Sequence, residues 1–159
     1  MSLLAVIDVQ RGFINEWTGH IPAAVEAAQA GFDRVFVSRF VNLPDSPYRR
    51  LIGWERFSPG SPETALAFAP RPYAMCYEKS IYSALTPGLL AAARDQPDLA
   101  VHLCGIATDN CVLKTAADLF EAGILPVVHA DWCASHGGAD FHQTGLAILR
   151  RLIGDAQVV

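Results

Sequence analysis

Apolar and polar residues alternate along the chain with two different periods. Short, nearly continuous apolar runs, rich in Val, Leu, Ile and aromatic residues, have the length of buried strands. We expect strands at residues 3–9, 34–40, 73–79, 99–106, 125–131 and 156–159. Between these runs, apolar residues recur at helical spacing. The spacing predicts helices at residues 22–31, 86–95, 111–123 and 140–154.

The regular alternation of strands and helices indicates the fold class. Consecutive parallel strands are joined by right-handed crossovers, and the crossover helices cover both faces of the sheet. The sequence therefore predicts a three-layer, Rossmann-like α/β fold with a six-stranded, mainly parallel sheet flanked by helices. We expect residues 1–159 to form a single domain, because this length suits one hydrophobic core and no linker or internal repeat interrupts it.

One region departs from this alternation. Residues 41–63 form an irregular stretch that is rich in Pro, Arg and aromatic residues. A long loop inside a compact domain is usually functional. We therefore expect this segment to be the wall or the lid of a pocket.

The composition narrows the range of partners. Hydrophobic residues make up 52% of the chain and charged residues 18%. The chain is more hydrophobic than an average globular domain. The additional apolar side chains have to be buried, either in an unusually apolar core or in a subunit interface. The formal net charge is -4 and the chain contains no basic run, which excludes nucleic acid and anionic membrane surfaces as partners. A small molecule is the ligand that we expect.

The N-terminus and the cysteines indicate where the protein works. The first apolar run is short and has no basic flank, so we interpret it as a strand and not as a signal peptide. No stretch approaches membrane-spanning length. The four cysteines, Cys76, Cys104, Cys111 and Cys133, are too sparse for a disulfide scaffold. We expect reduced thiols and a cytoplasmic protein.

Three residues with reactive side chains lie where predicted strands end. Ligands of such sheets bind beyond the carboxyl ends of the strands, where the strand order reverses. Asp8 ends the first apolar run, Lys79 ends the third, and Cys111 opens the helix after the fourth. A helix N-terminus stabilises a thiolate, so we expect Cys111 to be reactive. A thiol, a carboxylate and an ammonium group around one crevice are typical of nucleophilic catalysis.

Four stretches around these residues resemble a known family. They are IDVQRGF at 7–13, EKSIYSAL at 78–85, CGIATDNCVLKTAADLFEAG at 104–123, and ADWCAS at 130–135 followed by His142 and the terminal AQVV. From end to end, the chain is similar to the isochorismatase-like cysteine hydrolases. That superfamily includes nicotinamidases and N-carbamoylsarcosine amidohydrolases.

The resemblance implies a catalytic triad of Asp8, Lys79 and Cys111. It also implies a cis peptide bond between Ile106 and Ala107, and an oxyanion hole made by the backbone N–H groups of Ala107 and Cys111. In this scheme Asp8 takes the thiol proton, Cys111 attacks a carbonyl carbon, and a thioester forms. We therefore expect hydrolysis of a C–N amide-type bond in a small molecule, without a cofactor.

The chain departs from the nicotinamidase pattern after the second strand. There the resemblance implies an Asp and several His residues that bind a metal. Residues 38–78 contain no His, and Asp45 is their only Asp. We predict no metal site and no nicotinamidase activity. In place of a metal, we expect Arg39 to bind a substrate carboxylate through its planar guanidinium group. The other expected substrate-binding residues are Gln10, Phe13, Tyr48, Trp54, Tyr82 and Asn110.

Two other functions stay open at this point. Isochorismatases of the superfamily hydrolyse a vinyl ether by protonation from the Asp and do not need the Cys as a nucleophile. A catalytically idle protein that keeps the pocket and binds a metabolite is the other possibility. The presence of Cys111 favours amide chemistry.

The apolar composition and the resemblance both point to a homo-oligomer, either a dimer or a tetramer. The helix faces at residues 113–120 and 146–152 are the contact surfaces that we expect.

Overall fold

The computed structural model describes residues 2–95 and 99–159. Met1 and residues 96–98, which belong to the predicted domain, lie outside the described residues. The strands are β1 (Leu3–Ile7), β2 (Arg34–Phe40), β3 (Met75–Lys79), β4 (Val101–Ile106) and β5 (Pro126–Ala134). The α-helices are α1 (Ile21–Ala28), α2 (Pro47–Ile52), α3 (Pro87–Arg94), α4 (Leu113–Glu121) and α5 (Ala139–Ile153).

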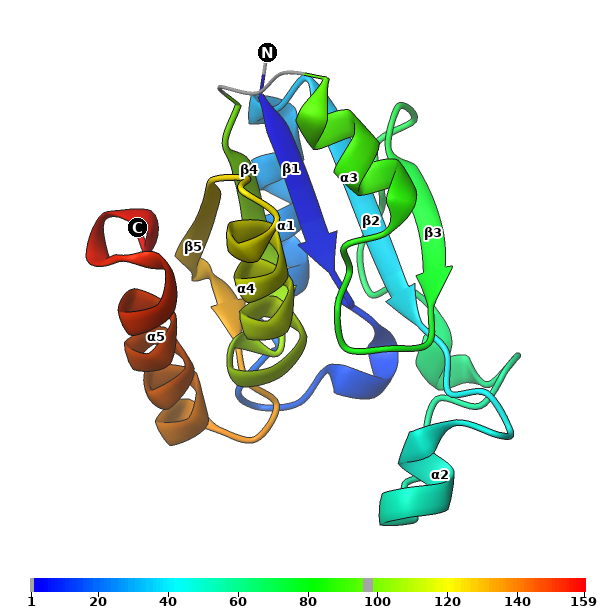
Figure 1. The fold of residues 1–159 in the computed structure, drawn as a ribbon. Helices are drawn as coiled ribbons and strands as arrows, with labels where there is room; N and C mark the ends of the chain where they lie inside the picture. The colour runs from blue at the N-terminus through cyan, green and yellow to red at the C-terminus, as the bar shows by residue number, and fades with distance from the viewer. Residues whose placement is uncertain (1, 96–98) are drawn as a thin grey trace.

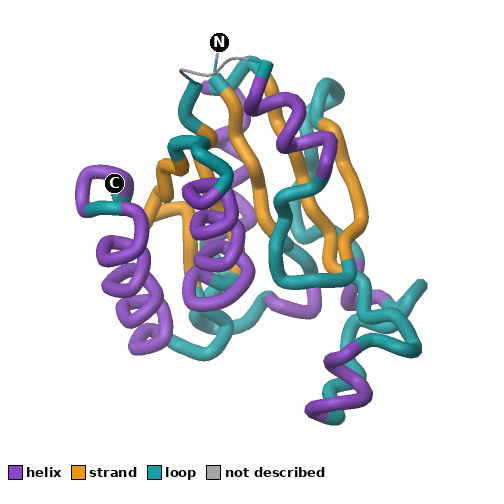
Figure 2. The backbone as a smooth tube through the Cα atoms, in the orientation of Figure 1, coloured by secondary structure: helices purple, strands orange, loops and turns teal. Residues whose placement is uncertain are grey.

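The described strands form one parallel sheet in the order β3-β2-β1-β4-β5. Helices α3 and α4 lie in front of the sheet, α1 lies behind it, and α5 packs beside α4 (Figure 1). Figure 2 shows the strands enclosed between these helical layers. The predicted three-layer α/β fold with a parallel sheet is confirmed.

The predicted sixth strand is wrong. Residues Asp155–Gln157 form a 3-10 turn, and the terminal segment pairs with β5 only through an isolated bridge between Val128 and Val158. Two backbone hydrogen bonds hold it there, from Ala130 N to Val159 O at 2.7 Å and from Val159 N to Val128 O at 2.9 Å. The turn uses most of the short segment, so too little extended chain remains for a strand.

The strand order positions a crevice at one end of the sheet. All of β1 is buried, because this central strand pairs with β2 on one side and β4 on the other and helices cover both faces. The chain leaves β1 toward β2 and later crosses back to β4, so the strand order reverses between β1 and β4. The carboxyl ends of these two strands therefore flank the predicted ligand site.

The irregular segment at residues 41–63 contains a helix that we did not predict. Ser46 caps α2 by accepting a hydrogen bond from Arg49 N at 3.3 Å, Pro47 occupies the first turn, and Gly53 ends the helix at φ +66°. Figure 1 shows α2 projecting from the body of the protein at the carboxyl end of the sheet. This position lets the segment serve as a wall of the crevice.

Across residues 2–95 and 99–159, we find no helix with the length and apolarity needed to cross a membrane.

Candidate active site

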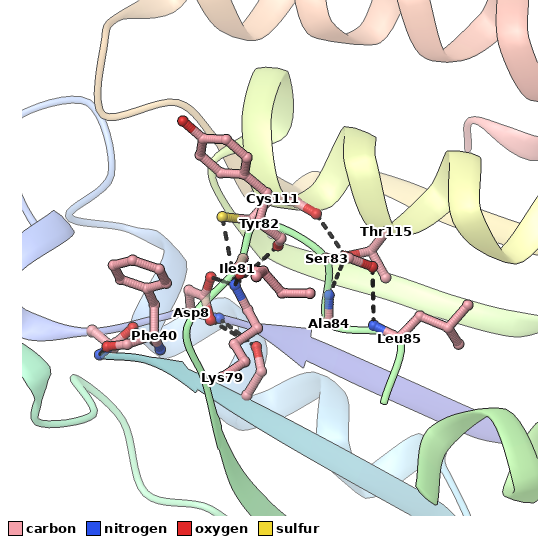
Figure 3. Close-up of polar contacts among 12 residues, drawn as sticks. Asp8, Phe40, Lys79, Ile81, Tyr82, Ser83, Ala84, Leu85, Cys111 and Thr115 are labelled. Carbon is pink, nitrogen blue, oxygen red and sulfur yellow. Dashed lines mark hydrogen bonds and ion pairs between the residues drawn. The ribbon is translucent and has the colours of Figure 1, made fainter. Parts of the chain in front are cut away.

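Asp8, Lys79 and Cys111 come together at the carboxyl end of the sheet. The Lys79 Nζ atom lies 2.7 Å from Asp8 Oδ2 and donates to Cys111 Sγ at 3.7 Å. Figure 3 shows the three side chains pointing toward one another, with the ammonium group between the carboxylate and the sulfur. All three residues are buried. The three residues are 32 or more positions apart in sequence, and the sheet order makes them neighbours.

The Asp8 carboxylate is held by Ser38, on the neighbouring strand β2, and by Lys79. Asp8 directly follows β1, has a φ of 49°, and is fully buried. Ser38 on β2 donates its hydroxyl to Asp8 Oδ1 at 2.7 Å and accepts from the Asp8 backbone N–H at 3.2 Å. A buried charge needs such partners to offset its desolvation. We did not predict Ser38, although its place in a strand beside the first one was a usable signal.

Lys79 is held in place by backbone oxygens as well as by Asp8. Its Nζ donates to Ile81 O at 2.8 Å and to Tyr82 O at 2.9 Å, and both carbonyls belong to the turn after β3 (Figure 3). The three N–H donors of the Lys79 ammonium group are therefore surrounded by four acceptors: one carboxylate, two carbonyls and the sulfur. The ammonium group is fixed in position without being free to reach a ligand.

Cys111 lies in a π-helical turn, Thr108–Val112, and not at the start of α4. π-helical turns are frequent at functional sites. The hydroxyl of Thr115 donates to Cys111 O at 2.7 Å and accepts from Ala84 N at 2.9 Å, which ties this turn to the loop after β3. Cys111 and the loop that holds the Lys79 ammonium group are thus positioned by the same small network.

The electrostatic environment does not activate the thiol in the way that we expected. Burial raises the pKa of Cys111, the nearby Asp8 carboxylate raises it further, and Lys79 only partly opposes this rise. The expected lowering of the pKa by a helix start is therefore wrong. A protonated thiol has to lose its proton in order to act as a nucleophile. The Asp8 carboxylate lies where it could accept that proton as a base.

A cavity of about 220 Å³ opens above the sulfur. Its lining residues are Phe13, Phe40, Tyr48, Ile52, Trp54, Tyr82, Ala107, Asn110, Cys111 and His136. Among these described residues, none is Asp, Glu, Lys or Arg. The cavity is smaller than most drug-sized pockets, and most of its wall is aromatic. Its small volume and the lack of charged side chains among its described lining residues suit a compact, uncharged molecule.

The cavity contains most of the residues that we predicted for substrate binding. Phe13, Tyr48, Trp54, Tyr82 and Asn110 line it together with the predicted oxyanion-hole residues. The peptide bond between Ile106 and Ala107 is cis, as the resemblance implies.

Sequence reasoning missed three lining residues, Phe40, Ile52 and His136. Phe40 follows Ser38 by two positions on β2, so strand alternation could have placed it on the same face.

Two predicted substrate-binding residues do not reach the cavity. Gln10 is fully buried; its Nε2 donates to Phe40 O and Thr64 O, both at 2.9 Å, and its Oε1 accepts from Phe40 N at 2.8 Å. Arg39 forms an ion pair with Glu78 and lines a different surface hollow. The reason is strand alternation, since Arg39 lies between Ser38 and Phe40 and therefore points to the opposite face.

Within the part of the chain that the structure describes, His, Cys, Asp and Glu side chains nowhere form a group of three or more that could hold a metal ion. Metal-independent chemistry stays a prediction that activity measurements have to test.

Comparisons with known proteins agree with this fold. A solved nicotinamidase from Bacillus subtilis superposes with a TM-score of 0.80 at 25% identity, covering 99% of this chain and 98% of that one. The N-carbamoylsarcosine amidase of Thermoplasma acidophilum has a TM-score of 0.72 at 22% identity, covering 94% and 93% of the two chains, which is a likeness of fold.

A curated relative adds a sequence match. Isochorismatase domain-containing protein 2 of Xenopus laevis is 35% identical over 95 residues, which are 51% of this chain and 46% of that protein. This chain spans about half the length of the Xenopus laevis protein and of its counterpart in Bos taurus. The family model described as the isochorismatase domain matches residues 2–157, which is nearly the whole sequence. The fold and the residues at the site agree with this match. The chain therefore belongs to the isochorismatase family, and this membership points to a hydrolase.

Proposed function

We propose that the protein is a cysteine hydrolase that cleaves a C–N amide-type bond in a small, uncharged molecule. The observation that carries this proposal is the position of Lys79 Nζ, 2.7 Å from Asp8 Oδ2 and 3.7 Å from Cys111 Sγ, beneath a cavity that is lined mostly by aromatic residues. A base, an orienting cation and a thiol in mutual contact are the parts that nucleophilic acyl transfer requires.

The first half of the reaction forms an acyl-enzyme. Asp8 accepts the thiol proton as the Cys111 sulfur attacks the substrate carbonyl carbon. The backbone N–H groups of Ala107 and Cys111 stabilise the negative oxygen of the tetrahedral intermediate, and such donors are each worth about 3–4 kcal/mol in comparable sites. The C–N bond then breaks, Asp8 gives its proton to the leaving nitrogen, and a thioester on Cys111 remains.

The second half releases the acid. Asp8 removes a proton from a water molecule, which attacks the thioester carbonyl. When the intermediate collapses, the C–S bond breaks and Asp8 returns the proton to the Cys111 sulfur. Lys79 keeps its proton throughout and holds the carboxylate in position.

The substrate is proposed to be uncharged because of what lines the cavity. We expected a carboxylate substrate on the basis of Arg39, but Arg39 faces away and forms an ion pair with Glu78. An anion in the cavity would lose its hydration without gaining a cationic partner from the lining residues, and this desolvation is costly. A single-ring or similarly compact amide fits the volume of about 220 Å³.

The test is a screen of small uncharged amides, ureas and carbamoyl compounds for ammonia release by the purified protein. Cys111→Ala should lower kcat for any substrate found by at least about a thousandfold, because the nucleophile is lost. Mass spectrometry of rapidly quenched wild-type protein should show an acyl group on the peptide that contains Cys111. Chelator treatment should leave the rate unchanged.

The alternatives give different results in the same experiment. A vinyl ether hydrolase would retain turnover of a vinyl ether in Cys111→Ala and lose it in Asp8→Asn. A protein that only binds a metabolite would show neither turnover nor an acylated cysteine. Activity lost to chelators and restored by zinc or iron would contradict metal independence.

A further inference from the structure

The turn at residues 80–85 carries the two carbonyl oxygens that hold the Lys79 ammonium group. Lys79 is the last residue of β3, and its Nζ atom donates to Ile81 O at 2.8 Å and to Tyr82 O at 2.9 Å. Ile81 is 57% exposed and Tyr82 is 41% exposed. Side-chain packing therefore fixes this half of the turn only weakly, and the position of the two carbonyls depends on how the rest of the turn is anchored.

The anchor of the turn is Ala84. This residue is fully buried, its backbone N–H donates to Thr115 Oγ1 at 2.9 Å, and its carbonyl accepts from the Tyr77 hydroxyl at 2.6 Å. Thr115 lies on α4 and is fully buried as well. A buried N–H that loses its acceptor is costly, so Ala84 stays where the Thr115 hydroxyl lies. Thr115 therefore sets the position of the turn.

The Thr115 hydroxyl also bonds to the π-helical turn that contains the thiol, donating to Cys111 O at 2.7 Å. A threonine that bonds to the carbonyl four residues earlier is common in helices and does not by itself indicate a function. The bond from Ala84 N is different, because it joins residues that are 31 positions apart in sequence. One hydroxyl group thus connects the turn of Cys111 with the turn that holds Lys79 (Figure 3).

This connection bears on the contact between the ammonium group and the sulfur. Lys79 Nζ lies 2.7 Å from Asp8 Oδ2 and 3.7 Å from Cys111 Sγ. The contact with the sulfur is the longer one, and a thiol is a weaker acceptor than a carboxylate. If the turn moved, the ammonium group would follow its carbonyl acceptors and keep its ion pair with Asp8. The contact with the sulfur would be lost first.

We propose that Thr115 is a positioning residue for the reaction, and that it acts through the turn at residues 80–85 to keep the Lys79 ammonium group against the Cys111 sulfur. The reaction itself, attack by the thiol on an amide, rests on the proposed function. The position of the ammonium group can be measured without turnover, because a cation beside the sulfur favours the thiolate and thereby speeds alkylation.

The test is the rate at which iodoacetamide alkylates Cys111 at pH 8, followed by peptide mass mapping in a Cys76→Ser background. Thr115→Val keeps the shape of the side chain and removes both hydrogen bonds. The rate should fall about threefold or more, which corresponds to a rise of about half a unit in the pKa of the thiol. Thr115→Ser keeps the hydroxyl and should restore the parent rate. With any substrate found in the screen, kcat should fall about tenfold in Thr115→Val and recover in Thr115→Ser.

A double-mutant cycle shows whether the effect passes through the cation. In a Lys79→Met background, Thr115→Val should cause no further slowing of alkylation, because the ammonium group is already absent. A threonine with a purely structural role predicts the opposite direction. Loosening the site would expose the buried thiol and speed its alkylation in both backgrounds.

Thr18→Val is the matched control. Thr18 is fully buried, donates to Phe13 O at 2.7 Å and accepts from Asn15 N at 2.9 Å, so it loses the same kind of bonds. Both partners lie outside the turn at residues 80–85, and the alkylation rate should stay at the parent value. If Thr115→Val fails to fold, Tyr77→Phe takes its place, because it removes the other bond that anchors Ala84 and should slow alkylation in the same way.

Four results would overturn the proposal: alkylation that is unchanged or faster in Thr115→Val, slowing that persists in the Lys79→Met background, a Thr115→Ser protein as slow as Thr115→Val, or an unchanged kcat in Thr115→Val. Failure of the proposed function gives a different result. In that case no compound in the screen is hydrolysed and no acyl group appears on Cys111, while the alkylation rates of the variants keep the expected order.

Discussion

At the Cys111 sulfur, burial and the Asp8 carboxylate act in one direction and the Lys79 ammonium group acts in the other. Burial is the larger effect, and the pKa of the thiol is raised. This direction favours a thiol over a thiolate in the resting protein. In the proposed mechanism, proton transfer to Asp8 accompanies the attack on the substrate, and Ser38 holds the carboxylate for this role.

This environment predicts an unusual pH dependence for chemical modification. In a Cys76→Ser background, which removes the exposed thiol, alkylation of Cys111 by iodoacetamide should accelerate about tenfold per pH unit from pH 7 to pH 9. The rate rises because only the thiolate reacts, and the raised pKa keeps its fraction small across this range. Peptide mass mapping at timed intervals measures the rate.

Two substitutions next to the sulfur provide the control. Asp8→Asn removes a negative charge that raises the pKa of Cys111, so alkylation at pH 8 should become faster although turnover is lost. Lys79→Met should make it slower, because the charge that lowers the pKa is lost. A rate that already levels off near pH 7 in the parent protein would show that the thiol is activated before substrate binds.

At the scale of elements, the site depends on how closely β4 approaches β1. Gly105 pairs with Ile7 on one side and with Cys133 on the other, at an irregularity in the β4–β5 register. Its φ of +124° is a conformation that other residues rarely adopt. Asp8 and Ala107 leave the two strands just beyond this point, so the close approach brings the base and the expected oxyanion donor to the same crevice.

Gly105→Ala should therefore be strongly destabilising. A Cβ at this position would lie 2.1 Å from Ile7 O, a backbone atom that cannot move without separating the strands. We expect a loss of about 3 kcal/mol in the free energy of unfolding, from overpacking together with an unfavourable φ. Urea denaturation followed by circular dichroism measures the loss.

Gly31→Ala is the matched control, because an added Cβ there would meet nothing within 4 Å. Its unfolding free energy should change by less than about 1 kcal/mol. If both variants were equally stable, the contact between β1 and β4 would not be as close as the structure shows.

At the scale of the whole molecule, several large apolar side chains are left exposed. Phe120 on α4 is 50% exposed, and Ile148 and Leu152 on α5 are 42% and 45% exposed. They belong to the two helix faces that we expected to form subunit contacts. Leu51 and Ile52 on the projecting helix α2 are 72% and 68% exposed. Apolar patches of this kind are typical of interaction surfaces.

The homo-oligomer stays a prediction, and light scattering tests it. The wild-type protein should give a mass of at least twice 17.2 kDa at micromolar concentration. A charge buried in an interface without a partner is costly, so Phe120→Asp should restore the monomer if α4 forms the contact. Ile148→Asp should do so if α5 forms it. Val159→Asp, at an exposed chain end, is a control that should leave the mass unchanged. A monomer mass for the wild-type protein over a wide dilution range would contradict the prediction.

The order of the strands β1 to β5, the helices α1, α3, α4 and α5, and the three residues at the centre of the site were determined by the sequence itself. Buried strands and amphipathic helices differ in the period of their apolar residues, so alternation along the chain indicates a parallel sheet without any tertiary information. In such a sheet, the carboxyl ends of the strands meet at one edge. Asp8 and Lys79 at strand ends, and Cys111 soon after a third, therefore had to lie near one another.

Only the tertiary structure decided which face each side chain occupies and how deeply it is buried. Alternation places Arg39 opposite Ser38 and Phe40, but the sequence does not say which face holds the cavity. Arg39 turned out to pair with Glu78, while Ser38 holds Asp8. The pKa of Cys111 likewise depends on burial. Burial is a sum over neighbours that are distant in sequence, and for that reason no local pattern encodes it.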